Sequence, residues 1–351
     1  MTVSLPRNAQ LWLPGYLKTI LTRRERPEHV WLMIGDHYEP LWSDGGAIAV
    51  TPETARGRVK AWRELWPRIA ERHRDSDNRP AQYTFFYPEE EYRPEYLEPL
   101  AEMARQSIAD VEIHLHHDAD TESAFVSRMA GFIRNLSENH GLLRSIDGRP
   151  VFGFIHGNWA LDNSLPGGLR CGLNNEITLL RDLGCYADFT LPSAPSPAQT
   201  RTVNRIYWAV DDPARPRSHE YGPAARVGGG RKGDLLMVQG PLGVRFGNGR
   251  WIPRLENGEL AEWDPPDASR VAVWFRVAPQ LGRHLFIKLY THGAQEQNAK
   301  MLLNGALDLL FDLVAARARA AGCRLHYATA WQVYRAIDSL CRGREPDVPG
   351  R

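Results

Sequence analysis

Short apolar stretches alternate with amphipathic stretches over the first half of the chain, and this alternation limits the possible folds more than any other feature. Each apolar stretch has the length of a buried strand, and each amphipathic stretch repeats its apolar residues at helical spacing. Alternating strands and helices form parallel βα units. We therefore predict an α/β fold with strands at 29–35, 83–87, 111–115, 151–155 and 185–188, and helices near 52–69, 95–109, 121–139 and 175–183.

Polar residues that can bind metals or move protons follow four of the expected strands. Asp36 and His37 end the first strand, and a histidine-rich run that begins at His114 ends another. His156 follows the strand at 151–155, and His292 follows a late strand near 287–291. Because catalytic residues of parallel α/β folds gather at the carboxyl ends of the strands, we expect these four segments to meet in one site.

The densest of these segments holds His114, His116, His117, Asp118 and Asp120 within seven residues. The first two histidines share a face of the expected strand, and the next two residues lie in the turn beyond it. Imidazole and carboxylate groups are ligands for Zn²⁺, Co²⁺, Mn²⁺ and Fe²⁺. The segment predicts a metal site; the alternative is a solvated turn with one histidine in the core.

Asp36, His37 and Glu39 form a second polar segment at the end of the first strand. A carboxylate beside a metal ion can deprotonate a water molecule that the metal has already acidified. We assign that role to Asp36, while His37 or Glu39 could add a metal ligand. Alone, this segment is equally typical of a turn cap.

Polar groups at the remaining strand ends could contact a substrate. We expect substrate binding by His156, Asn158, Trp159 and Asp188, and proton donation to the leaving group by His292, whose side chain titrates near neutral pH. Each could instead be a hydrogen-bonded capping residue. Aromatic side chains nearby that could stack on sugar rings are Tyr38, Trp42 and Trp159.

Composition excludes several classes of protein. The formal net charge is +1, from 43 basic and 42 acidic side chains, so no overall field points to nucleic acid. The four cysteines are scattered without a C-x-x-C pair, which favours buried, reduced thiols over zinc fingers or disulfides. No stretch has the length of a transmembrane helix, and the first residues lack the pattern of a signal peptide. We therefore expect a cytoplasmic protein.

Two parts of the chain fall outside the βα pattern. Residues 1–28 are expected to form an extension whose helix packs on the domain, although its apolar face could instead rest on a membrane surface and make the protein peripheral. Residues 211–268 are rich in Pro, Gly and Arg and read as an insertion with a small hairpin near 235–253. Two helices are expected over 296–341, and the domain as a whole over 29–345.

Taken in order, these segments resemble the homology domain of the polysaccharide deacetylase superfamily, the NodB-like type of carbohydrate esterase family 4. The family's T-F-D-D-G motif is similar to the residues ending in Asp36 and His37, which places Asp36 on the catalytic base and His37 on a metal ligand. Its H-S/T-x-x-H motif is similar to His114 through Asp118, with the aspartate in place of the second histidine, and His116 is a rival ligand. Later motifs fall on the segments of His156, Asn158, Trp159, Asp188 and His292.

The resemblance implies a distorted (β/α)7-type barrel over about 29–200 and 283–340 that holds one divalent metal ion, Zn²⁺ first, with Co²⁺, Mn²⁺, Fe²⁺ or Ni²⁺ as alternatives. His114 would bind the metal together with two of His37, His116 and Asp118. The implied reaction removes an acyl group, most simply N-acetyl, from a carbohydrate. Two other functions remain open at this point: a metal-dependent amidase for a small nitrogenous substrate, and a non-catalytic carbohydrate-binding or assembly protein. The oligomeric state is open as well.

Overall fold

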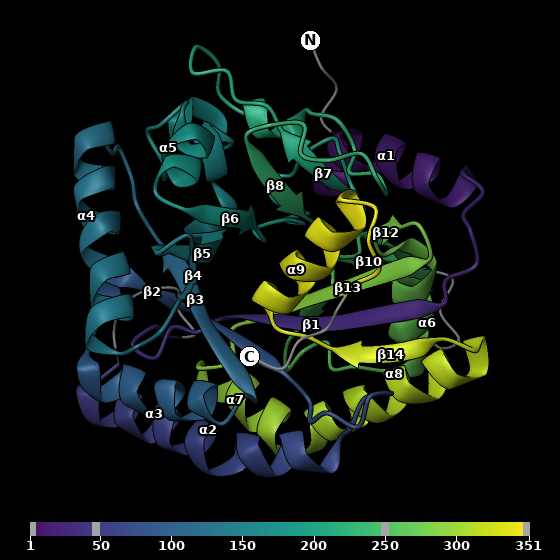
Figure 1. Cartoon of the computed structure of the whole chain (residues 1–351), viewed down its shortest axis with the longest axis horizontal. Helices are drawn as coiled ribbons and strands as arrows, with labels where there is room; N and C mark the ends of the chain where they lie inside the picture. The colour runs from purple at the N-terminus through teal and green to yellow at the C-terminus, as the bar shows by residue number, and fades with distance from the viewer. Residues whose placement is uncertain (1–4, 44–49, 247–252, 347–351) are drawn as a thin grey trace.

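The computed structural model describes residues 5–43, 50–246 and 253–346. It is a mixed α/β structure with a large, mostly parallel central sheet (Figure 1). The helices are α1 (Ala9–Leu21), α2 (Pro52–Arg72), α3 (Pro94–Arg105), α4 (Glu122–Arg134), α5 (Glu176–Asp182), α6 (Ala268–Val277), α7 (Glu296–Met301), α8 (Leu307–Ala321) and α9 (Ala330–Cys341). The strands are β1 (His29–His37), β2 (Tyr83–Pro88), β3 (Ala109–Leu115), β4 (Arg144–Ile146), β5 (Arg149–His156), β6 (Cys185–Asp188), β7 (Ile206–Ala209), β8 (Leu235–Val238), β9 (Gly243–Phe246), β10 (Pro253–Glu256), β11 (Glu259–Leu260), β12 (Gln280–Leu281), β13 (His284–Thr291) and β14 (Arg324–Tyr327).

The strand order in the main sheet is β11-β13-β1-β2-β3-β5-β6-β8-β7. All neighbours from β11 to β8 run parallel, and β7 is antiparallel to β8. One edge of β1 pairs with β13 along its length, whereas the other edge pairs first with β14 and then with β2. The predicted α/β class is therefore confirmed, and the carboxyl ends of six consecutive parallel strands, from β13 to β6, meet at one end of the sheet.

Local sequence signals account for the elements that were predicted. The side chain of Thr51 accepts a hydrogen bond from the backbone N–H of Thr54 at 3.2 Å and caps α2, which begins at Pro52 as expected. The five strands predicted before residue 190 are β1, β2, β3, β5 and β6, with ends shifted by a few residues. The region from 296 to 341 is more complex than two helices, because β14 separates α8 from α9 and joins the main sheet.

Side chains of the strands alternate between two cores on opposite faces of the sheet. On β1, Val30, Leu32 and Ile34 belong to the core that α2, α3, α4, α5, α6 and α8 cover. Trp31 and Met33 belong to the other core, which α9 covers. Figure 1 shows the larger set of helices around the sheet and α9 across its opposite side. This period of two decides which way each residue at a strand end points.

The segment 211–268, predicted as an insertion outside the barrel, contributes to the main sheet. Its strand β8 pairs in parallel with β6, and β11 pairs in parallel with β13. The predicted hairpin near 235–253 is also wrong in its bounds: the hairpin consists of β9 and β10, and residues 247–252 between them lie outside the described residues. The Pro- and Gly-rich stretches form the loops of this segment, while its short strands β8 and β11 pair with strands that are far away in the sequence.

The N-terminal helix α1 packs on the rest of the chain through two aromatic side chains. Trp12 and Tyr16 are buried against Val203, Leu242 and Val277. Leu21, at the end of the same helix, is exposed. Among the described residues, every helix is too short or too polar to cross a lipid bilayer.

Three histidines stack at the amino end of the sheet, on β1, β13 and β14. The rings of His29 and His284 lie 4.4 Å apart between centroids, and Nδ1 of His29 lies 2.9 Å from Nε2 of His326. Trp31 donates a hydrogen bond from Nε1 to Nδ1 of His284 at 3.1 Å, so this nitrogen is unprotonated. Protonation of the stack would break this hydrogen bond and set like charges side by side.

We expect the folded chain to lose stability in mild acid because of this stack. Burial, with the neighbouring histidines adding to it, lowers the pKa of His284 to about 4, and burial outweighs Asp77 to lower the pKa of His326 to about 4. An unfolded histidine titrates near 6.5, so below about pH 6.5 the unfolded chain binds protons that the folded chain takes up only near pH 4. Two histidines that each titrate about 2.5 pH units lower in the folded chain set an upper limit of about 7 kcal/mol on the fall in the free energy of unfolding. Solvent screening lowers the expected fall to roughly 3 kcal/mol, and these groups have no effect above this pH window.

Urea unfolding at about pH 7.5 and about pH 4.5 measures this loss. The double variant His284→Gln, His326→Gln removes both titrating groups and should lose less stability between the two pH values than the wild type. Equal losses in the two proteins would show that the stack is not responsible.

Candidate metal centre

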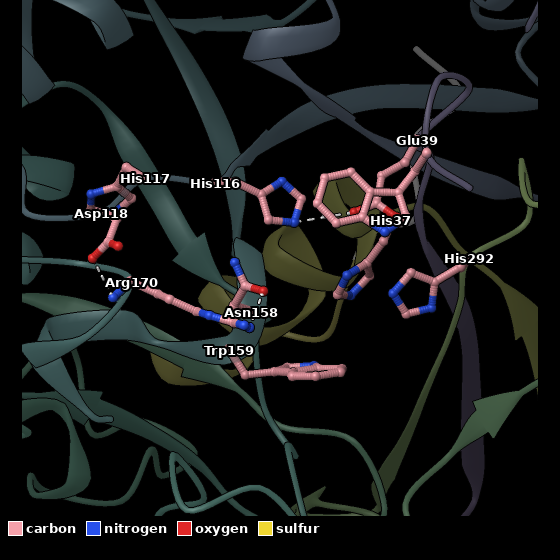
Figure 2. Close-up of a pocket in the computed structure, with 10 residues that line it drawn as sticks. His37, Glu39, His116, His117, Asp118, Asn158, Trp159, Arg170 and His292 are labelled. Carbon is pink, nitrogen blue, oxygen red and sulfur yellow. Dashed lines mark hydrogen bonds and ion pairs between the residues drawn. The ribbon is translucent and has the colours of Figure 1, made fainter. Parts of the chain in front are cut away.

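A cavity of about 730 Å³ opens at the carboxyl ends of the parallel strands (Figure 2). Its lining comes from segments that are far apart in the sequence: the ends of β1, β3, β5 and β13 and the loop after β5. The lining residues are His37, Glu39, Trp42, His116, His117, Asp118, Asn158, Trp159, Arg170 and His292. The four strand-end segments that were expected to meet each contribute to this lining, through His37, His116, Asn158 and His292.

Glu39, His114 and His116 form a compact group of metal donors beside this cavity. Oε1 of Glu39 lies 3.3 Å from Nε2 of His114 and 3.3 Å from Nε2 of His116. The three donor atoms lie within 4.8 Å of one another, and the other carboxylate oxygen of Glu39 is buried without a hydrogen-bond partner among the described residues. Two imidazoles and one carboxylate are a donor set suited to Zn²⁺ and related divalent ions.

Both histidines of this group are held by their other ring nitrogen. Nδ1 of His114 lies 2.8 Å from the carbonyl oxygen of Ile155, which can only accept, so this nitrogen donates and Nε2 carries the lone pair. Nδ1 of His116 donates to the carboxylate of Glu90, which follows β2. A histidine that binds a metal usually donates its second N–H to a carbonyl or carboxylate in this way. The two rings are therefore oriented as ligands require.

The charges around His116 differ from those around His114. Burial lowers the pKa of His114 to about 3, and the nearby His116 adds to the shift, so His114 is neutral. Burial also disfavours the charged form of His116, but the hydrogen bond to Glu90 and the Glu39 carboxylate outweigh it and raise its pKa. Burial raises the pKa of Glu39, against the pull of His292 and His116. The neighbouring carboxylates thus shift the pKa of His116 in the opposite direction from that of His114.

Two more histidines lie next to the donor group. The ring of His37 is 4.9 Å from that of His114 and 4.8 Å from that of His292, measured between centroids. Both His37 and His292 line the cavity, and Figure 2 shows their rings facing each other on the side of Glu39. Burial and the neighbouring imidazoles lower the pKa of both, so both are neutral at pH 7.

Asp36 points to the opposite face of β1 from His37, because neighbouring residues of an extended strand alternate. It is fully buried, accepts hydrogen bonds from Gly293 N at 2.6 Å and from the Tyr83 hydroxyl at 2.9 Å, and does not line the cavity. Burial raises its pKa to about 8 despite these bonds. Its contacts fix the backbone beside His292. The alternation that was used for His114 and His116 also predicts, from the sequence alone, that Asp36 and His37 point to opposite faces of their strand.

The loop after β5 forms the opposite wall of the cavity. Arg170 donates from its backbone N–H to Asp118 at 2.7 Å and from its guanidinium to the Asn158 side chain at 2.6 Å. Asp118 is exposed and lies outside the group of three donors. A side chain at Gly157 would place its Cβ 2.3 Å from the ring of His116, so only glycine fits between the loop and this histidine.

His156 and Asp188, both predicted to bind substrate, are fully buried and do not line the cavity. The carboxylate of Asp188 accepts hydrogen bonds from Thr190 N at 3.0 Å and from the Thr190 hydroxyl at 2.7 Å. His156 faces Glu176 behind the cavity wall, where Nε2 lies 3.5 Å from the carboxylate. Asn158 and Trp159, in contrast, line the cavity as predicted.

Comparison with protein-family models and with curated proteins gives no match to this chain. The candidate site therefore rests on its own geometry. That geometry adds Glu90 and Arg170 to the residues that sequence patterns had singled out. Glu90 could have been found by the rule that placed the others, since it follows a buried strand, but Arg170 lies in a loop whose position has no local sequence signal.

Proposed function

We propose that the chain is a metal-dependent hydrolase that removes an acyl group, most simply N-acetyl, from a carbohydrate, in the manner of the polysaccharide deacetylases it resembles. The observation that supports this proposal best is the group of Glu39, His114 and His116 beside an open cavity, with His292 at its edge. Zinc sites with three protein ligands and room for a fourth are typically catalytic.

In this proposal the metal ligands are Glu39, His114 and His116. The ligand set differs from the one implied by the resemblance, which was His114 with two of His37, His116 and Asp118. Glu39 was a candidate ligand only because it lies just beyond the end of the first strand. A divalent ion held there supplies Lewis-acid chemistry, since it acidifies a water molecule and polarises a carbonyl group. The unpartnered carboxylate oxygen of Glu39 and the unprotonated Nε2 of His114 fit such an ion. Zn²⁺ is the simplest choice for two imidazoles and one carboxylate.

The chain's own acid–base group in this proposal is His292. Its neutral imidazole lines the cavity and can accept a proton from the attacking water and then return it to the leaving amine. The proposal moves the proton-accepting role away from Asp36, which faces the other side of the strand and accepts a hydrogen bond on each oxygen. Asp36 is instead a positioning residue that holds the backbone of Gly293, next to His292.

A carbohydrate suits the walls of the cavity. Trp42 stacks on His116 with centroids 4.9 Å apart, and Trp159 forms the floor seen in Figure 2. Aromatic faces pack against the C–H faces of sugar rings, while hydroxyl groups need donors and acceptors at the rim. Asn158, Arg170 and Asp118 supply both on the far side of the cavity.

We also propose that the central sheet is the distorted barrel that the resemblance implies. Lys288 on β13 donates from Nζ to the carbonyl oxygens of Phe189 and Leu191, which follow β6. These strands are separated by β1, β2, β3 and β5 in the sheet, so the sheet curves enough for a side chain to cross between them. The curvature gathers the strand ends around one cavity.

Acetate release by the zinc-loaded chain tests the proposed function. N-acetylated amino-sugar oligosaccharides should release acetate, a chelator should stop the release, and added Zn²⁺ should restore it. Release from small amides but not from glycans would replace the proposal by an amidase. Glycan binding without release of any acyl group would replace it by a carbohydrate-binding protein, and absence of bound metal under zinc-replete conditions would overturn it.

A further inference from the structure

A second group of metal donors lies behind the cavity wall, outside the site proposed above. It consists of His117, His156, Cys171 and Glu176, all buried, with donor atoms within 4.8 Å of one another. We propose that these four residues form a second metal site, with Zn²⁺ as the preferred ion and a structural role. This inference does not depend on the proposed reaction.

The three contacts that Glu176 makes with the other members of the group are close to the spacing of neighbouring zinc ligands. Oε1 of Glu176 lies 3.1 Å from Nε2 of His117 and 3.5 Å from Nε2 of His156, and the sulfur of Cys171 lies 3.3 Å from Oε2. Zinc bonds of about 2.0–2.3 Å place neighbouring ligand atoms roughly 3.3–3.8 Å apart. Donor atoms that all lie within 4.8 Å of one another can close around such an ion after small side-chain movements.

His156 points an unsatisfied nitrogen into this group. Its Nδ1 donates to the carbonyl oxygen of Gly157, so Nε2 carries the lone pair. The residue is 0% exposed, and Nε2 has no hydrogen-bond partner within the described part of the chain. A buried polar atom without a partner destabilises the fold. A metal ion would satisfy this nitrogen, whereas a purely structural hydrogen-bond cluster leaves it unpaired.

The surroundings of the other ligands also suit a cation. Burial and the neighbouring Glu176 raise the pKa of the Cys171 thiol, and the backbone N–H groups of Asn163 and Leu173, each 3.4 Å from the sulfur, oppose this shift. A metal ion bound at this sulfur would deprotonate the thiol. Behind His117, the carboxylate of Asp120 lies 3.4 Å from Nδ1 and adds negative charge beside the group, while Nδ1 itself makes no hydrogen bond within the described residues. Two neutral imidazoles, one thiolate and one carboxylate balance the charge of a divalent ion.

The position of the group assigns it a structural role. Four protein ligands close the coordination of zinc and leave no place for a substrate. His117 directly follows His116, and the loop between His156 and Cys171 carries Asn158 and Trp159 of the cavity wall. An ion bound here would fix this loop against the end of β3 and so set the position of the wall.

Cobalt substitution of the full chain tests this site with a readout that is independent of activity. Co²⁺ should bind in two equivalents per chain, and one of them should give the near-ultraviolet charge-transfer absorption of a thiolate ligand. Cys171→Ser should lose that absorption and one equivalent of metal, and Glu176→Gln should weaken both. Cys185→Ser is the matched control, since Cys185 is also buried but lies outside the donor group.

The spectrum of the cobalt-loaded wild-type chain already shows whether a thiolate binds the metal, so the test does not depend on whether a variant folds. Cobalt binding without thiolate absorption, or absorption that persists in Cys171→Ser, would overturn the second site. Glu39→Gln should keep the thiolate absorption while losing the other equivalent. Failure of the proposed reaction would leave all of these spectra unchanged, so the two proposals fail separately.

Discussion

Glu39→Gln is expected to lose one equivalent of bound metal per chain and, with it, nearly all hydrolytic activity. The substitution keeps the shape of the side chain but replaces a charged oxygen ligand by a neutral amide. Changing a group behind a ligand typically costs 10–100-fold in metal affinity or activity, so loss of a ligand should cost more than about 100-fold. Metal analysis after dialysis and the initial rate of acetate release measure the two effects.

Two further variants test which residues bind the metal and which only orient a ligand. Glu90→Gln keeps all three ligands but weakens the group that orients His116, and should reduce metal affinity by about 10–100-fold. Asp118→Asn is the control for metal content, because Asp118 lines the cavity outside the donor group and should retain the ion. If Asp118→Asn lost the metal and Glu39→Gln kept it, the ligand set would be the one implied by the resemblance.

Glu256→Gln is expected to destabilise the fold by about 3–5 kcal/mol, because it removes the carboxylate that accepts two hydrogen bonds from the buried Arg270 and leaves the more distant Asp264, 3.7 Å away, to balance its charge. The Glu256 carboxylate accepts two hydrogen bonds from Arg270, each at 2.9 Å, and one from Trp274 Nε1 at 2.9 Å. Glu256 and Arg270 are fully buried, and Arg245 adds a second ion pair at 3.1 Å. These contacts tie β10 to α6, so urea unfolding should show a clear fall in midpoint.

Glu64→Gln is the matched control for that measurement. Glu64 pairs with Lys60 at 3.8 Å one helical turn away, and both side chains are exposed. Exposed pairs contribute little, so the free energy of unfolding should change by less than about 0.5 kcal/mol. Equal effects of the two substitutions would mean that the Glu256 network does not behave as a buried ion pair.

Much of the fold was predictable because it depends on local patterns. Apolar runs followed by helical periodicity located β1, β2, β3, β5 and β6 and the helices between them. Strands β8, β11 and β14, of two to four residues each, were not predicted as members of the sheet. Their pairing is decided by partners far away in the sequence.

The residues of the candidate site were likewise predictable only where a local pattern decides the direction of the side chain. His114 and His116 were predicted to share a face of β3, since the alternation of a strand is a local property, and both now contribute to one donor group. The same alternation holds on β1, although the predicted site placed Asp36 and His37 together. It places Asp36 on the face that contacts the larger set of helices and His37 at the cavity.

The sequence by itself determined which residues end the parallel strands, because backbone periodicity and turn chemistry act over a few residues. Only the tertiary structure decided that Glu39, and not Asp118, meets the two histidines, and that His117 and His156 turn toward Cys171 and Glu176. Glu39, His117, Asp118 and Cys171 lie in turns and loops, where side-chain direction follows no period, while His156 and Glu176 lie at the ends of β5 and α5. Their approach depends on how distant strands pair and how the sheet curves, and this information is spread over the whole chain.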